Sequence, residues 1–401
     1  GEGNVILNLK DNTITKNEAS STGGGLAVAN KNQTLNLDGD IIEGNTSKSS
    51  GGGIHMGSDS TMTMTGGSIS NNHSDKLGGG IYGVSRKKIT LNGTKVQSNT
   101  ANNGGGIYLY SKTELEAGEG TVISDNKANT NGGGIYNNGS IVTLKDGSVL
   151  TNNTAEESGG GLYNKGKVTV ESGATLMNNT AEECGGGLYN KGEAIVESGA
   201  KLYNNHAAQA GDDIYLAGKG STLTLTKVGD DWTLDDCGHK INGWFADLLD
   251  ARWDADGKQE HVINLKDYKA DGLISVENNE DGSFTITILD ENATLALKAA
   301  HNVTPKPTPE PDPEPTPTPG PVTPETPENP PVEDATPDEA ETPVTPENPE
   351  TPPVQDATPD STVAALPKTG VNWFTALAMA LSGMALMAAG AFTSLFAKSK
   401  H

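Results

Sequence analysis

A triplet of glycines recurs along the first half of this chain at nearly constant intervals. The triplets begin at residues 23, 51, 78, 104, 132, 159 and 185, and a degenerate copy, Gly-Asp-Asp, begins at residue 211. The steps between them are 28, 27, 26, 28, 27, 26 and 26 residues. A fixed period in this range is the signature of a repeat architecture, in which each copy forms one structural unit. The repeat therefore predicts that residues 1–218 form a stack of similar units.

Asparagine recurs with the same period, and an aliphatic residue stands three positions before each copy. Because stacked asparagines stabilise parallel strands that are in register, we expect each amide to bond the units above and below it. The predicted ladder follows Asn17 and comprises Asn45, Asn72, Asn99, Asn126, Asn153, Asn179 and Asn205.

Each repeat contains three short runs that favour strand over helix. In residues 159–181 the runs are separated by glycine-containing breaks, and Val168 and Val170 alternate with polar residues. Such alternation places one face of a strand inside and the other outside. A single unit cannot bury its own apolar face, so stability has to come from stacking neighbours. The sequence therefore predicts an all-β fold, a right-handed parallel β-helix of about eight rungs of 26–28 residues with three strands in each rung.

These motifs carry a resemblance to known repeats. The pattern Gly-Gly-Gly-Ile with Ile-x-x-Asn is similar to the GGA(I/L/V) and FxxN repeats of polymorphic outer-membrane and adhesin-type β-helices. More generally, residues 5–225 resemble right-handed parallel β-helix proteins of the pectate-lyase-like kind. The chain departs from the pattern by using Ile, Leu or Val where those repeats use Phe. The resemblance implies the fold and leaves adhesin, enzyme and passive stalk open, because this fold carries all three.

Composition excludes some functions. The chain has a net charge of −24 and two arginines, Arg86 and Arg252, whereas nucleic-acid binding requires a basic surface. We therefore expect no nucleic-acid partner. The 51 glycines and the aromatic content of 4% favour a thin solenoid over a large globular core.

The second half of the chain divides into three parts. Residues 219–302 follow the last regular repeat; they contain a predicted hairpin that turns at residues 280–282 and, at 242–253, a short helix or aromatic-rich turn. This part is either a β cap or a small binding module. Residues 303–362 are rich in Pro, Thr and Glu, and 304–362 hold 14 acidic residues against one lysine. Such a segment cannot bury a core and is expected to form an extended, disordered stalk.

The last part, residues 363–401, combines three features in a fixed order. A Leu-Pro-Lys-Thr-Gly motif precedes 27 residues without a charge, 371–397, and a basic tail at 398–401. The uncharged stretch is long enough to cross a bilayer as a helix. The ordered triple resembles the sorting signal of Gram-positive cell-wall-anchored proteins, the substrates of sortase. The motif consists of Leu366, Pro367, Lys368, Thr369 and Gly370.

The resemblance implies the partners and the chemistry. A sortase cysteine cleaves the bond between Thr369 and Gly370 and passes the Thr369 carbonyl to an amine of the peptidoglycan precursor. The precursor spans the membrane transiently through residues 371–397, and the product is attached covalently to the cell wall at the cell surface. A plain single-pass membrane protein is the alternative. Because the chain lacks a leader and begins directly with a rung, we expect a signal peptide and further rungs or a cap to precede residue 1.

The candidate binding surface is a column of tyrosines, each directly after the inward aliphatic residue of a repeat. Neighbouring side chains on a strand point to opposite faces, so the tyrosines should face outward. They form either a stabilising aromatic ladder or a flat stripe that binds glycans or host surfaces by stacking. The column comprises Tyr82, Tyr108, Tyr136, Tyr163, Tyr189 and Tyr215.

The sequence predicts no catalytic site and no cofactor. Asp212 and Asp213 are weak candidates for Ca²⁺ without a calcium-repeat motif, and whether Cys184 pairs with Cys237 stays open. The leading prediction is therefore a wall-anchored adhesin or display protein that binds glycans or host or neighbour-cell surfaces. The alternatives are a carbohydrate-active β-helix enzyme, namely a polysaccharide lyase or hydrolase, and a passive structural spacer.

Overall fold

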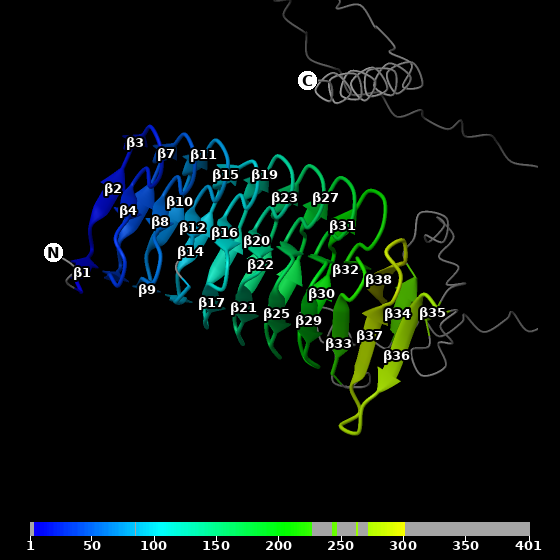
Figure 1. Ribbon diagram of the computed structural model, residues 1–401. Helices are drawn as coiled ribbons and strands as arrows, with labels where there is room; N and C mark the ends of the chain where they lie inside the picture. The colour runs from blue at the N-terminus through cyan, green and yellow to red at the C-terminus, as the bar shows by residue number, and fades with distance from the viewer. Residues whose placement is uncertain (1–3, 85, 227–242, 247–261, 264–271, 301–401) are drawn as a thin grey trace, which may run out of the picture. The chain divides into compact units, whose positions relative to one another are not determined.

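The computed structural model describes residues 4–84, 86–226, 243–246, 262–263 and 272–300, which form a parallel β-solenoid (Figure 1). The chain passes through four strands in each coil, and eight coils follow one another at the period of the glycine triplets. The strands stack into four sheets, named A to D here. The sequence predicted three strands in each coil; the structure adds a fourth of two residues directly after the ladder asparagine.

Sheet A has 11 strands, and its first nine are parallel and in register. Its order is β1 (Ile6–Lys10), β5 (Thr34–Asp38), β9 (Thr61–Thr65), β13 (Lys88–Asn92), β17 (Glu114–Ala117), β21 (Ile141–Leu144), β25 (Lys167–Val170), β29 (Glu193–Val196), β33 (Thr222–Leu225), β37 (Phe284–Ile288) and β36 (Ile274–Asn278).

Sheets B and C have eight strands each and are parallel. Sheet B consists of β2 (Thr13–Thr15), β6 (Ile41–Glu43), β10 (Ser68–Ser70), β14 (Lys95–Gln97), β18 (Val122–Ser124), β22 (Val149–Thr151), β26 (Thr175–Met177) and β30 (Lys201–Tyr203). Sheet C consists of β3 (Glu18–Ala19), β7 (Thr46–Ser47), β11 (His73–Ser74), β15 (Thr100–Ala101), β19 (Lys127–Ala128), β23 (Thr154–Ala155), β27 (Thr180–Ala181) and β31 (His206–Ala207).

Sheet D carries the tyrosine column and again has 11 strands. From the first coil it runs β4 (Leu26–Val28), β8 (Ile54–Met56), β12 (Ile81–Gly83), β16 (Ile107–Tyr110), β20 (Ile135–Asn138), β24 (Leu162–Asn164), β28 (Leu188–Asn190), β32 (Ile214–Ala217), β38 (Thr294–Ala300), β34 (Gly243–Ala246) and β35 (Val262–Ile263).

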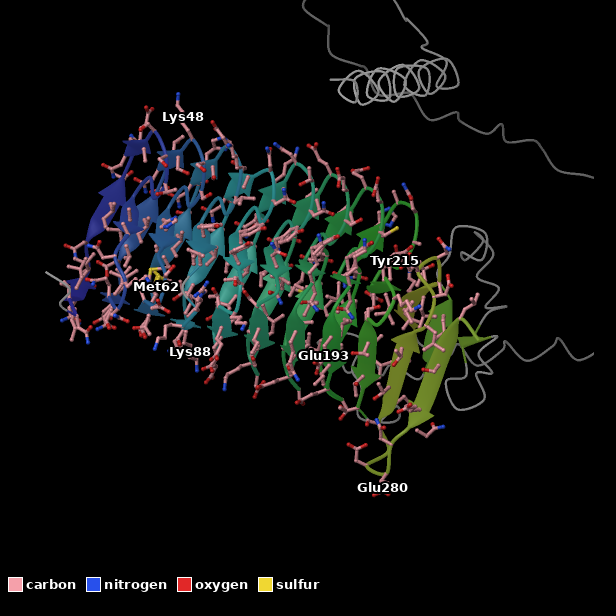
Figure 2. All side chains as sticks on the ribbon, viewed as in Figure 1. Lys48, Met62, Lys88, Glu193, Tyr215 and Glu280 are labelled. Atoms are coloured by element: carbon pink, nitrogen blue, oxygen red, sulfur yellow. The ribbon has the colours of Figure 1, made fainter. Side chains whose placement is uncertain are left out.

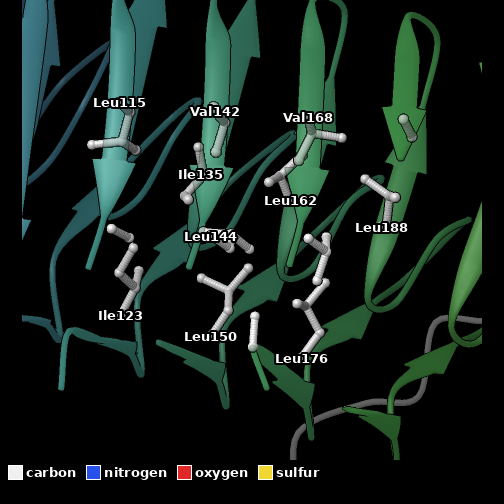
Figure 3. Close-up of a cluster of buried hydrophobic side chains, with 14 of the residues drawn as sticks. Leu115, Ile123, Ile135, Val142, Leu144, Leu150, Leu162, Val168, Leu176 and Leu188 are labelled. Atoms are coloured by element: carbon white, nitrogen blue, oxygen red, sulfur yellow. The ribbon is translucent and has the colours of Figure 1, made fainter. Parts of the chain in front are cut away.

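The core lies inside the coils and consists of columns of aliphatic side chains (Figure 3). The alternation read from the sequence is correct, since Val168 and Val170 are fully buried while Thr169 between them faces outward. Sheet B supplies the aliphatic residue that stands three positions before each asparagine, such as Leu150 and Leu176. Each column is continuous because the parallel strands are in register.

Antiparallel strands close the last coil. β37 pairs with β33 and β38 pairs with β32, and the predicted hairpin is present as β36 and β37. Phe284, Ile286 and Leu297 are buried and join the core of the coils. The described part of residues 219–302 therefore covers the end of the core. Within 242–253, where a helix or turn was expected, residues 243–246 form β34, and the others lie outside the described residues.

The predicted stalk at 303–362 and the predicted sorting region at 363–401 lie outside the described residues. No helix within the described ranges is long and apolar enough to cross a membrane.

Candidate functional site

The asparagine ladder is present at the corner between sheets B and C. In the middle of the stack, Asn126 Nδ2 donates to Asn153 Oδ1 at 2.9 Å, and Asn153 Nδ2 donates to Asn179 Oδ1 at 3.0 Å. Asn153 Nδ2 also donates to the Ile123 carbonyl oxygen of the preceding coil at 2.9 Å. Each amide therefore bonds the coil above and the coil below, as the sequence predicted. All seven predicted ladder asparagines after Asn17 are buried.

A left-handed residue turns the chain just before each ladder asparagine. Its φ is 57° at Asp125 and 55° at Asn152, and Gly44 takes the same place in an earlier coil with φ of 63°. Asn, Asp and Gly tolerate this conformation better than other residues, which explains their frequency at this position. The ladder asparagines thus stand at a sharp turn that is repeated in every coil.

The three glycines of each triplet meet three different constraints. Gly159 has φ of 72°, and a Cβ there would lie 2.8 Å from the Tyr163 Cβ. A Cβ on Gly160 would overlap with the carbonyl oxygen of Thr180 in the next coil, and one on Gly161 would lie 2.6 Å from the Gly187 oxygen. The first glycine therefore allows a left-handed corner, and the other two allow close contact between coils.

The degenerate triplet in the last coil ends the ladder. Asp213 stands where the earlier coils have their third glycine, and its Oδ1 accepts a hydrogen bond from Asn205 Nδ2 at 2.9 Å. Asp212 Oδ1 accepts from the Ala207 backbone N–H at 2.8 Å, and its Oδ2 contacts Lys298 Nζ at 2.6 Å. These carboxylates, the weak Ca²⁺ candidates, replace the hydrogen-bond acceptors that a further coil would supply.

The tyrosine column faces away from the aliphatic core, as predicted, but it is not an open stripe. Successive rings stack with centroids 4.7–5.6 Å apart along the column from Tyr82 to Tyr215. Tyr108, Tyr136 and Tyr163 are only 6–7% exposed, and they form a second apolar cluster. Of the two arrangements left open by the sequence, the column has the geometry of the stacked ladder, in which neighbouring rings cover much of one another.

The pKa values of three of the stacked tyrosines are raised. Burial raises the pKa of Tyr108 to about 12, although a hydrogen bond from Asn138 Nδ2 to its hydroxyl oxygen opposes the shift. Burial likewise raises the pKa of Tyr163 and of Tyr189. A tyrosinate is poorly solvated there, so these three tyrosines stay neutral well above the pH at which an exposed tyrosine ionises.

A second asparagine ladder lies inside sheet D and was missed from the sequence. Asn137 Nδ2 donates to Asn164 Oδ1, and Asn164 Nδ2 donates to Asn190 Oδ1, each at 2.7 Å. All three side chains are fully buried. The available signal was the Tyr-Asn pair in three consecutive repeats, which places these asparagines on the inward side of the strand.

Other candidate groups are dispersed. No three His, Cys, Asp or Glu side chains in the described ranges are grouped so that they could hold a metal ion. Cys184 lies beside the tyrosine column and is partly buried, while Cys237 falls outside the described residues, so their pairing is not tested. Leu366, Pro367, Lys368, Thr369 and Gly370 also lie outside them, and the sorting motif stays a prediction from the sequence.

Comparison with known proteins identifies the coils. A family model described as a right-handed beta helix region matches residues 2–170, which is less than half of the chain. No curated protein and no solved structure matches the chain. The match supports the predicted handedness and the β-helix repeats. Residues 2–170 are thus similar to the right-handed β-helix family, and the described coils form a parallel β-solenoid.

Proposed function

We propose that this protein is a surface protein that sortase attaches to the Gram-positive cell wall through Thr369, with the β-helix displayed as an adhesive head. The observation that carries the proposal is the ordered sequence of residues 366–370, the uncharged residues 371–397 and the basic tail. The Pro-rich residues 303–362 would span the wall between the anchor and the head.

The chemistry of attachment belongs to the partner. A sortase thiolate attacks the Thr369 carbonyl carbon, the bond to Gly370 breaks, and the chain from Gly370 onward leaves with its new amino terminus. An amine of the peptidoglycan precursor then displaces the thiolate and forms an amide with Thr369. Pro367 fixes its own φ at about −65° and presents a bent segment to the enzyme.

Adhesion is the favoured role of the head because the coils have a filled interior and long outer surfaces. Aliphatic side chains occupy the inside of the coils, so a partner has to bind on the outside. Every outward position is repeated from coil to coil, which suits an extended partner such as a glycan chain or a neighbouring surface. A head that served only as a spacer would bind none of these partners.

Replacement of Thr369 tests the anchor. In Thr369→Ala the scissile bond no longer follows threonine, and we expect the protein to move from the wall fraction to the membrane and the medium. Lys368→Ala is the control, since its position tolerates variation in the motif, and it should stay in the wall. Unchanged wall attachment of Thr369→Ala would show that the proposal is wrong.

A binding screen tests the head. The full chain in non-ionic detergent is incubated with a panel of polysaccharides and matrix proteins, and each polysaccharide is analysed for shortened products. Retention without cleavage supports adhesion, product formation supports the enzyme alternative, and no retention by any partner supports a spacer.

A further inference from the structure

Positive charge collects at one corner of the coils. This corner, the D–A corner, comprises the residues between the end of each sheet D strand and the start of the next sheet A strand. Over eight coils it holds seven cations and one anion, Asp59. The seven cations, named the basic ridge here, are Lys31, Arg86, Lys87, Lys112, Lys165, Lys191 and Lys219.

The neighbouring corner has the opposite charge. Between the sheet A strands and the sheet B strands, the same eight coils hold six anions and one cation, Lys145. The six anions are Asp11, Asp40, Glu119, Asp146, Glu171 and Glu197. The fold therefore places cations and anions at different corners. The net charge of −24 does not reveal this separation.

The ridge side chains are exposed, and two of them lie against the tyrosine column. Lys165 Nζ lies 5.3 Å from the centre of the Tyr163 ring, and Lys191 Nζ lies 5.5 Å from that of Tyr189. These distances are typical of cation–π contacts, which attract the ammonium without neutralising it. Among the residues that the structure describes, Lys165 and Lys191 form no ion pair with a carboxylate.

The spacing of the coils makes the ridge an extended line of charge. Coils are stacked about 4.8 Å apart, so the seven steps from Lys31 to Lys219 span about 34 Å. A sheet A strand of four or five residues separates the ridge from the acidic corner by about 13–17 Å. This separation exceeds the Debye length of about 8 Å at physiological salt, so the acidic corner is largely screened from the ridge. The nearer carboxylates are Glu114 and Glu193 at the start of their sheet A strands, and Glu193 is paired with Lys167.

We infer that the basic ridge binds a linear anionic polysaccharide that carries carboxylate or phosphate groups along its length. The inference rests on the proposed function, which places the head among glycans and wall polymers. An extended polyanion matches an extended row of lysines by charge and by shape. Single-stranded nucleic acid fits less well, because its binding sites use open aromatic faces and the tyrosine faces here are covered by one another.

Charge reversal at the ridge tests the inference. The full chain in non-ionic detergent is titrated at low and physiological salt with polygalacturonate, wall teichoic acid, neutral dextran and single-stranded DNA. The ridge variant is Lys165→Glu with Lys191→Glu. The control, Lys48→Glu with Lys76→Glu, makes the same change in net charge at exposed lysines between sheets C and D. Figure 2 shows Lys48 on the side of the coils opposite Lys88, the residue that follows the ridge residue Lys87.

We expect the parent to bind one or both anionic polysaccharides, more weakly as salt rises, and to ignore dextran. Since each cation near an anionic surface contributes roughly a fivefold gain in binding, loss of the two lysines should weaken binding roughly 25-fold, and the two added carboxylates should weaken it further. The control variant should bind nearly as well as the parent. Whether polygalacturonate or teichoic acid is preferred identifies the carboxylate or phosphate as the recognised group.

The inference would be overturned by equal loss in both variants, by retention of dextran as well as the polyanions, or by binding of DNA alone. Absence of polyanion binding by the folded parent would also overturn it. Circular dichroism of each variant verifies that the β-sheet content is unchanged. Wall attachment is measured separately, from the amount of Thr369→Ala in the wall fraction. A failure of polysaccharide binding by the ridge is therefore distinguishable from a failure of wall attachment.

Discussion

The coils with a glycine triplet and the last coil, with Gly211, Asp212 and Asp213, turn the same corner with different side chains. Where another parallel coil follows, the second and third glycines face its carbonyl oxygens and have no room for a Cβ. In the last coil antiparallel strands follow instead, and two aspartates are accommodated. The difference teaches that the glycines are required by the neighbouring coil and not by the corner alone.

The largest expected effect comes from putting a side chain on a middle glycine. A Cβ in Gly160→Ala would overlap with the Thr180 oxygen and lie 2.7 Å from the Gly186 oxygen, so two coils have to separate. We expect the variant to lose about 3 kcal/mol or more of unfolding free energy, measured by urea denaturation.

Gly139→Ala is the matched control for Gly160→Ala. Gly139 has φ of 75°, but nothing lies within 4 Å of its Cβ position. Its left-handed conformation alone should lower the unfolding free energy by about 1 kcal/mol. Equal losses in the two variants would contradict the role of contact between coils.

The next effect compares a middle and a terminal member of the asparagine ladder. Asn153→Ala removes the acceptor for Asn126 and leaves the buried Ile123 carbonyl without the amide donor. Unfolding free energy should fall by about 3 kcal/mol, because buried polar groups lose their partners.

Asn17→Ala should lower the unfolding free energy by less than about 1 kcal/mol, since Asn17 is exposed and bonds only one neighbouring coil. The same urea denaturation measures both variants. A loss at Asn17 as large as that at Asn153 would contradict the argument.

A smaller effect shows whether Asp213 stabilises the last coil by its hydrogen-bond acceptor or by its negative charge. Asp213→Asn keeps an oxygen that can accept from Asn205 Nδ2, so its stability should be close to that of the parent. Asp213→Ala removes that acceptor and should lower the unfolding free energy by about 1–2 kcal/mol. Thermal unfolding of both variants distinguishes the two explanations. If Asp213→Asn is as unstable as Asp213→Ala, the negative charge of Asp213 is what stabilises the coil.

The smallest effect at ordinary pH concerns the tyrosine column. Because the pKa of Tyr108 is raised to about 12 in the folded state, its folded form binds the proton more tightly than the unfolded form does. The resulting stability is fully present below about pH 10 and is lost as the pH rises through about 12. Ultraviolet absorbance should show tyrosines that ionise only during alkaline unfolding. Complete ionisation near pH 10 with the fold intact would contradict the buried column.

Much of the coil could be predicted because its chemistry is repeated. The ladder asparagines and the alternation around Val168 recur with the period of the triplets, so a local pattern became visible eight times. The strands of sheet C were missed because two residues such as Thr154 and Ala155 are too short to show a strand pattern. The burial of Tyr163 could not be predicted because alternation gives the direction of a side chain and not what covers it.

The sequence by itself determined the period, the parallel stacking and the positions of the ladder, because one unit cannot bury its apolar side alone and every copy has to meet its neighbour in the same way. Only the tertiary structure decided which side chains share a corner. The closed tyrosine column and the second ladder at Asn164 arise from residues 26–28 positions apart that stacking places about 4.8 Å apart, and the basic ridge arises from residues one or two such steps apart.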